Sequence, residues 1–139
     1  MGNKIRILMI DDEEDFTEPM AFWLRSKGHD VDTVISGGLG VEKIEKDPPD
    51  IVFLDIFMPV MNGVETLKKI RRVNLDIPVI MLTSAVIENV QEAYSMEELN
   101  KLGVSGFFKK KDSFEELARL LEITLRLHKN LKRPDDRTE

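Results

Sequence analysis

The most constraining feature of this chain is a short apolar run that ends in one carboxylate. Residues 51–54 are all apolar, Asp55 follows them directly, and Pro59 ends the stretch. A run that is apolar on both faces is typical of an inner strand of a parallel sheet, which helices cover from both sides. Ligands bind such sheets at the carboxyl ends of the strands. Asp55 is therefore predicted to lie at the functional edge of a parallel sheet.

Strands and helices are predicted to alternate along the chain. Four further runs have strand character, at residues 5–10, 31–35, 78–82 and 104–108, and helical spacing or capping patterns occur over residues 14–27, 39–46, 62–73, 95–102 and 114–131. Parallel strands need right-handed crossovers, which helices supply. The second strand is half polar and is expected at an edge. These features predict an α/β flavodoxin-like, doubly wound, five-stranded parallel sheet of order 2-1-3-4-5 with five helices.

Several helix details are also predicted. Asn62 is expected to cap the third helix, with the basic residues of 68–72 on its solvent face and Val64, Leu67, Ile70 and Val73 on its buried face. Gly37 and Gly38 are expected to end the second strand before the helix at 39–46 begins. Residues 95–98 resemble a capping box. The last helix has two apolar stripes, of which only one can face the sheet fully; the stripes are Leu117, Leu121 and Leu125, and Leu120, Ile123 and Leu127.

The composition excludes several classes of protein. The chain of 139 residues has no cysteine, which excludes a disulfide, a thiolate nucleophile and a cysteine zinc site. Its net charge of -6 disfavours direct nucleic-acid binding. The N-terminus has neither a signal-peptide core nor an apolar run that could cross a bilayer. We expect a cytoplasmic protein with no membrane contact, in which residues 4–131 form one domain and residues 132–139 form a disordered polar tail.

The polar residues at the strand ends are predicted to form one site. Asp11 and Asp12 end the first strand, Asp55 ends the third, Thr83 ends the fourth and Lys110 follows the fifth. Three neighbouring carboxylates repel one another unless a cation lies among them. Oxygen ligands alone favour a hard ion, and Mg²⁺ fits better than zinc. A carboxylate beside Mg²⁺ and a lysine can act as a nucleophile toward phosphorus, giving an aspartyl phosphate.

The motifs at these positions resemble those of the receiver domains of two-component response regulators, including the chemotaxis regulators. The motifs are residues 7–13 (ILMIDDE), 55–63 (DIFMPVMNG), 81–84 (MLTS) and 103–110 (GVSGFFKK). Each is weak alone, but their order and spacing are specific. The resemblance covers about residues 4 to 130.

This resemblance implies a role for each acid. Asp55 would be the phosphoacceptor. Asp12 would bind Mg²⁺ directly, Asp11 would hold the ion largely through water, and the main-chain carbonyl of Phe57 would complete the protein ligands.

The resemblance also implies a switch and its partners. Thr83 would be the switch hydroxyl, Phe107 the aromatic that moves with it, and Lys110 the lysine that pairs with the phosphate. The phosphodonor would be a histidine kinase or a phosphotransfer protein. The face formed by the fourth helix, the fifth strand and the last helix would contact a downstream target or output domain, or a second copy in a homodimer. The chain would be a signalling switch that assists its own phosphorylation and slow dephosphorylation, not an enzyme.

The sequence departs from the family pattern at three places. Lys111 stands where proline usually follows the lysine, often through a cis bond, so the peptide is either trans or strained, and Lys109 competes with Lys110 for the role. Phe57 and Ala85 offer no group that would orient a hydrolytic water, which predicts a long-lived phosphoryl group. The segment between residues 83 and 103 is about five residues longer than usual, so the partner face is expected to be remodelled.

Two alternatives remain at this stage. One is a small-molecule phosphohydrolase with an aspartyl-phosphate intermediate, although Phe57 stands where such an enzyme needs an acid. The other is a degenerate receiver that only binds partners, although the intact acid pair argues against it.

Overall fold

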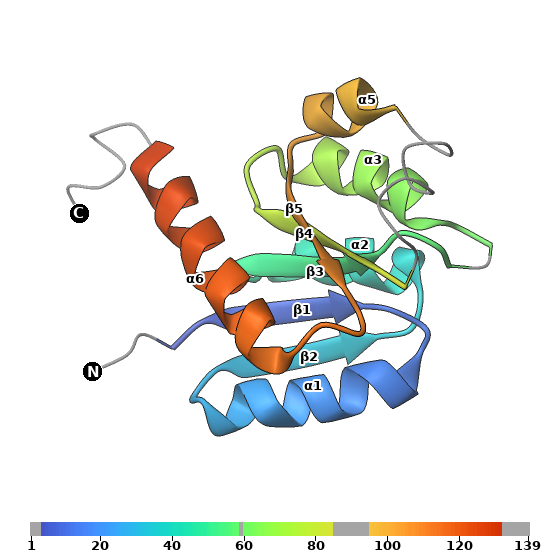
Figure 1. The fold of residues 1–139 in the computed structure, drawn as a ribbon. Helices are drawn as coiled ribbons and strands as arrows, with labels where there is room; N and C mark the ends of the chain where they lie inside the picture. Colours follow the sequence, from blue (N-terminus) through green and yellow to red (C-terminus); the bar gives the residue numbers. More distant parts are fainter. Residues whose placement is uncertain (1–3, 59, 85–94, 132–139) are drawn as a thin grey trace.

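The fold is an open parallel sheet covered by helices on both faces (Figure 1). The computed structural model describes residues 4–58, 60–84 and 95–131, the last three of them by backbone alone. The strand order is β2-β1-β3-β4-β5, and every neighbouring pair is parallel, as predicted. The strands are β1 (Arg6–Ile10), β2 (Asp30–Val34), β3 (Ile51–Asp55), β4 (Val79–Thr83) and β5 (Val104–Lys109). The predicted strand limits agree with these within one residue.

Five helices lie in the described part of the chain, as the sequence predicts. They are α1 (Glu14–Ser26), α2 (Gly37–Lys46), α3 (Gly63–Val73), α5 (Met96–Lys101) and α6 (Phe114–Leu131). None of these helices is long and apolar enough to cross a membrane. The predicted tail at 132–139 and the predicted insertion before α5 lie outside the described residues.

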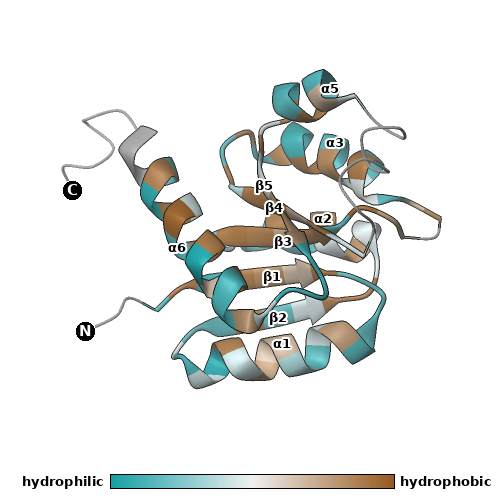
Figure 2. Ribbon diagram, viewed as in Figure 1, coloured by the Kyte–Doolittle hydropathy of each residue, from teal (hydrophilic) through white to brown (hydrophobic). Residues whose placement is uncertain are grey.

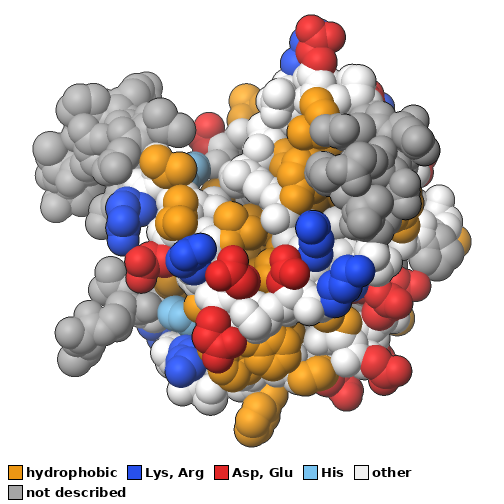
Figure 3. Space-filling view, viewed as in Figure 1, with side chains coloured by type: hydrophobic (Ala, Val, Ile, Leu, Met, Phe, Trp, Pro, Cys, Tyr) orange, Lys and Arg blue, Asp and Glu red, His pale blue; other side chains and the backbone are white. Residues whose placement is uncertain are grey.

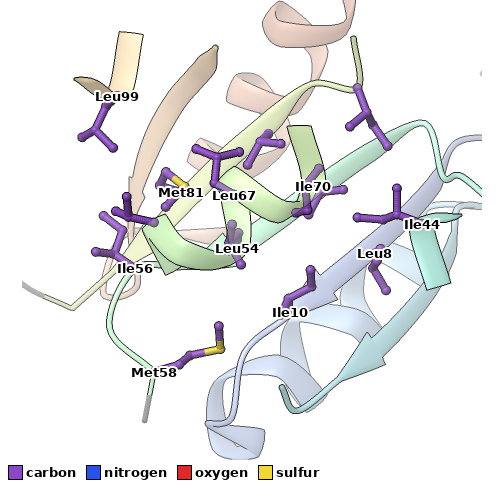
Figure 4. Close-up of a cluster of buried hydrophobic side chains, with 14 residues drawn as sticks. Leu8, Ile10, Ile44, Leu54, Ile56, Met58, Leu67, Ile70, Met81 and Leu99 are labelled. Atoms are coloured by element: carbon purple, nitrogen blue, oxygen red, sulfur yellow. The ribbon is translucent and has the colours of Figure 1, made fainter. Parts of the chain in front are cut away.

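The core is divided by the sheet into two apolar layers. Alternate residues of β1 and β3 point to opposite faces, because side chains alternate along a strand. Leu8 and Leu54 pack with α2, α3 and α5 on one face (Figure 4), whereas Met9 and Phe53 pack with α1 and α6 on the other. Inner strands β1 and β3 are hydrophobic except for one terminal residue each, Arg6 and Asp55, and edge strand β2 is largely hydrophilic (Figure 2). This contrast is the pattern that predicted the strand order.

Helix α2 begins two residues earlier than predicted. Ser36 is its N-cap, and the Ser36 side chain accepts a hydrogen bond from the N–H of Leu39 at 3.2 Å. Gly37 and Gly38 therefore belong to the helix and do not merely end the strand. A Cβ atom at Gly37 would lie 2.1 Å from the hydroxyl of Thr66 on α3, so the missing side chain lets the two helices approach closely.

Helix α3 confirms the predicted cap and corrects two other predictions. Asn62 and Glu65 form a complete capping box. Val73 is 39% exposed and does not share the buried face. Arg71 is not on a purely solvated face: its guanidinium donates to the carbonyls of Leu102 (2.7 Å) and Gly103 (3.2 Å). Burial lowers the pKa of Arg71.

The contacts of Arg71 connect α3 to the end of α5, where the chain turns into β5. A second link between the two helices is the ion pair of Lys68 with Glu98, at 3.3 Å. At the other end of α5, Ser95 accepts from the N–H of Glu98 at 2.9 Å, as expected for its cap. Helix α5 is therefore held by α3 along much of its short length.

Helix α6 presents one apolar stripe to the sheet. Leu117 and Leu121 are buried in the layer shared with α1, and Leu125 packs against it. Of the second stripe, Leu120 is partly buried and packs against the same layer, whereas Ile123 and Leu127 are exposed. On the face of the molecule that Figure 3 shows, Asp and Glu side chains intermingle with Lys and Arg side chains.

The start of α3 depends on a glycine packed against the end of β3. A Cβ atom at Gly63 would lie 2.2 Å from the carbonyl oxygen of Asp55, a contact with rigid backbone. We predict that Gly63→Ala lowers the free energy of unfolding by about 1–3 kcal/mol, the usual range for overpacking. Urea denaturation would measure the change.

Gly38→Ala is the matched control, because a Cβ there meets no atom within 4 Å. Replacing glycine by alanine inside a helix is expected to stabilise the protein by about 0.5–1 kcal/mol. If both substitutions change the free energy of unfolding equally, the close approach between Gly63 and the Asp55 carbonyl is contradicted.

Candidate functional site

The predicted site residues converge at the carboxyl edge of the sheet. Asp11 directly follows β1, and its N–H donates to Val34 of β2 at 3.1 Å. Asp55 is the last residue of β3 and Thr83 the last of β4. Lys110 follows β5, and its N–H donates to the carbonyl of Thr83 at 2.9 Å. These two backbone bonds join β1 to β2 and β4 to β5 at the edge where the side chains converge.

Three carboxylates form a cluster suited to a cation. Asp11, Asp12 and Asp55 each offer an oxygen, and these oxygens lie within 4.8 Å of one another. Asp11 and Asp55 are buried, whereas Asp12 is exposed to solvent. Within the described residues, Oδ2 of Asp11 has an ion pair with Lys110 but no aligned hydrogen bond, so it retains an acceptor for a ligand. An all-oxygen donor set with an open side fits Mg²⁺.

Lys110 is the cation of the site. Its Nζ lies 2.8 Å from Oδ2 of Asp11 and 3.4 Å from Oδ2 of Asp55, and it also pairs with Glu13. The ammonium stands over the ring of Phe16, 5.2 Å from its centroid. The neighbouring Lys109 is the exposed last residue of β5. No described peptide bond is cis, so the chain enters Lys111 through a trans bond.

The electrostatics of the cluster show how strongly the two buried acids depend on cations. Burial raises the pKa of Asp55 to about 7, and the charge of Asp11 adds to the rise; Lys110 opposes it. Burial also raises the pKa of Asp11, again against Lys110. Burial would lower the pKa of Lys110, but its contacts with the carboxylates of Asp11 and Glu13 raise the value above the usual one. A further cation would favour the charged form of both acids.

Thr83 and Phe107 lie on the same face of the sheet. Met81 pairs with Phe107 and Thr83 with Lys109, so Thr83 and Phe107 are diagonal neighbours on adjacent strands. Phe107 packs against the apolar layer under α3 and α5, and Thr83 is buried. Their switching roles stay predictions.

Phe57 borders the site. Its N–H donates to Oδ1 of Asp55 at 3.2 Å, and its ring is 45% exposed. The proposed metal contact of its carbonyl stays a prediction. Ala85, the other residue predicted to offer no group to a hydrolytic water, lies outside the described residues.

Glu13 is the functional contact that sequence reasoning missed. Glu13 lies in an acidic run, residues 11–15, of a kind that is typical of a solvated helix start, and this residue does precede α1. Its N–H donates to Oδ1 of Asp11 at 2.9 Å, and its carboxylate pairs with Lys110, 97 residues away. The local sequence carries no signal of this pairing.

Comparisons with known proteins agree with the geometry. The sequence matches the response regulator receiver domain family over residues 7–122. It is 32% identical over 137 residues to the transcriptional regulatory protein TrcR of Mycobacterium tuberculosis, covering 97% of this chain and 51% of the relative. It is 35% identical over 79 residues to the alkaline phosphatase synthesis transcriptional regulatory protein PhoP of Bacillus subtilis, covering 57% of this chain and 33% of PhoP.

A solved structure shows the same fold. The chemotaxis protein CheY4 of Vibrio cholerae superimposes with a TM-score of 0.77 at 25% sequence identity, covering 88% of this chain and 99% of CheY4. The chain spans about half the length of TrcR, and the matched segment covers a third of PhoP. The family match, the strand order and the acid cluster lead to one conclusion: this chain belongs to the response regulator receiver domain family of two-component systems.

Proposed function

We propose that this chain is a phosphorylation-operated switch whose phosphoacceptor is Asp55. The observation that carries the proposal is the surroundings of Asp55: a lysine ammonium at 3.4 Å and two further acids within 4.8 Å, at the carboxyl edge of a parallel sheet. The donor would be a phosphohistidine of a histidine kinase or phosphotransfer protein. Such donors work in the cytoplasm, where we place this chain.

The transfer uses groups that the structure brings together. A carboxylate oxygen of Asp55 attacks phosphorus, the P–N bond of the phosphohistidine breaks, and the imidazole leaves with the electron pair. Lys110 would neutralise charge on the phosphoryl oxygens, and Thr83 would donate its hydroxyl to one of them. Asp11, Asp12, Asp55 and the Phe57 carbonyl would hold Mg²⁺, which when bound supplies charge neutralisation at the same oxygens.

Phosphorylation would change the affinity of a distant face for a partner. Thr83 and Phe107 would shift together toward the phosphorylated site and alter the face formed by α5, β5 and α6. A modification moves such an equilibrium only if it binds one arrangement better than the other. The partner would be an output domain or a separate protein, and a homodimer through this face is the other candidate.

A small-molecule phosphohydrolase is less well supported. That chemistry needs an acid two residues after the nucleophile to protonate the leaving group. Phe57 occupies this position, and its N–H binds the nucleophile itself. Accumulation of the phosphorylated protein, without turnover of a substrate, would distinguish the switch from the enzyme.

The first prediction concerns the phosphoacceptor. Incubation with acetyl phosphate and Mg²⁺ should add one phosphoryl group to the wild type, giving a base-labile adduct in intact-protein mass spectra. Asp55→Ala should give no adduct, because the nucleophile is gone. Omitting Mg²⁺ should reduce the yield strongly.

Asp15→Ala, a change of another acid close to the site, serves as the control and should be phosphorylated like the wild type. A folded wild type that never forms the adduct would instead identify a degenerate receiver that acts by binding alone. An adduct that survives in Asp55→Ala would assign the acceptor to another residue.

A second prediction follows from the raised pKa of Asp55. Its folded value of about 7 exceeds the ordinary 3.8, so the folded state binds the proton more tightly and stability is lost as pH rises between these values. In EDTA, Asp55→Asn should therefore unfold with a free energy about 1–3 kcal/mol higher than that of the wild type at pH 8. The difference should vanish near pH 4, as urea denaturation would show.

Mg²⁺ should reverse this preference in the wild type. At pH 8 the added metal is expected to stabilise the wild type more than Asp55→Asn, because the variant has lost one anionic ligand. If the variant is no more stable than the wild type at pH 8 in EDTA, the raised pKa of Asp55 is contradicted.

A third prediction concerns the lifetime of the phosphoryl group. The exposed ring of Phe57 offers no polar group to a hydrolytic water, so the wild-type adduct should persist for minutes or longer after the donor is removed. Phe57→Gln should shorten this lifetime at least about threefold, because the amide can orient the water. Val60→Gln, which replaces a fully exposed apolar residue of the same loop, should leave it unchanged.

A further inference from the structure

The Lys110 ammonium has as many carboxylate partners as it has N–H groups. A lysine has three donors and no acceptor. Asp11, Asp55 and Glu13 all lie within ion-pair distance of Nζ. A phosphoryl oxygen that approaches Nζ would therefore compete with carboxylates that already lie within ion-pair distance of it.

Glu13 is the partner that is most easily released. Its side chain is 57% exposed, whereas the side chains of Asp11 and Asp55 are 0% and 5% exposed. Water can solvate a released Glu13, and exposed ion pairs contribute little free energy. A carboxylate left unpaired in the interior is far more costly. Asp55 must also remain near Lys110, because it carries the phosphoryl group.

The backbone keeps Glu13 at the site even when its carboxylate is released from Lys110. Its N–H is bonded to Asp11 at 2.9 Å, and its side chain makes no capping bond to α1. Pairing with Lys110 is thus the contact that the structure assigns to this carboxylate.

We infer that Glu13 is a positioning residue that holds Lys110 in the unphosphorylated protein and competes with the phosphoryl group for it. This inference rests on the proposed phosphorylation of Asp55. Removing the carboxylate frees Lys110 for the incoming phosphoryl group and removes a negative charge beside it. Glu13→Gln should therefore form the adduct faster and lose it more slowly, each by about two- to fivefold, in keeping with the modest strength of an exposed ion pair.

The experiment compares four proteins: wild type, Glu13→Gln, Glu13→Asp and Glu14→Gln. Each is phosphorylated with acetyl phosphate at saturating Mg²⁺, and intact mass follows adduct formation and, after donor removal, adduct loss. Glu14 is an exposed acid in the first turn of α1, so Glu14→Gln makes the same charge change next to Glu13. Glu13→Asp keeps the charge but shortens the reach to Lys110.

Both Glu13 variants should differ from the wild type in the stated direction, and Glu14→Gln should not. The ¹⁵N resonance of Lys110 Nζ in the unphosphorylated protein should move in both Glu13 variants and stay in place in Glu14→Gln. Urea midpoints should agree among all four, which separates positioning from a loss of stability.

Four results would overturn the inference. Equal effects of Glu13→Gln and Glu14→Gln would show a general charge effect, and slower phosphorylation of Glu13→Gln would show that Glu13 assists the lysine. A wild type that is phosphorylated on Asp55 at the same rates as Glu13→Gln would refute this inference alone. A wild type that is not phosphorylated would overturn the proposed function as well.

Discussion

The structure of this edge depends on one interaction, the pairing of the Lys110 ammonium with two buried aspartates. Asp11 and Asp55 are brought together by strands that are neighbours in the sheet, so their proximity is fixed by the fold. Two carboxylates in such surroundings cannot both be charged without a nearby cation. Lys110 supplies one positive charge, yet burial and the charge of Asp11 still raise the pKa of Asp55 to about 7. A further cation at this edge would favour the charged form of both acids.

The same argument explains why the sequence predicted so much of the site. Asp11, Asp55 and Lys110 are each attached to the end of a strand, and parallel strands bring their carboxyl ends to one edge. Once the apolar runs identify the strands, the positions of the acids and the lysine at this edge follow. The fold and the composition of the cluster were therefore predictable from residue order alone.

The parts that were not predicted depend on contacts between distant segments. Arg71 lies on a helix face that its basic neighbours mark as solvated, yet it is half buried because the carbonyls at the end of α5 lie within its reach. Glu13 looks like one acid of a charged helix start, and only its distance to Lys110 distinguishes it from Glu14. Gly37 leaves room for the hydroxyl of Thr66 on α3, a contact that the local sequence does not indicate. Local patterns indicate helical periodicity and caps, but they do not indicate which residue of a distant segment a side chain will contact.

These distant contacts also connect the acid cluster to the face under α5. Helix α3 begins against the backbone of Asp55, where Gly63 allows no side chain, and ends with Arg71 bonded to the carbonyls that lead into β5. A second connection passes from Thr83 to Phe107 within the sheet. Proximity alone does not transmit a signal; each connection must have two arrangements that phosphorylation favours differently. In the proposed switch, Thr83 and Phe107 would supply them. The contacts at the two ends of α3 would then hold that helix in place while the pair changes.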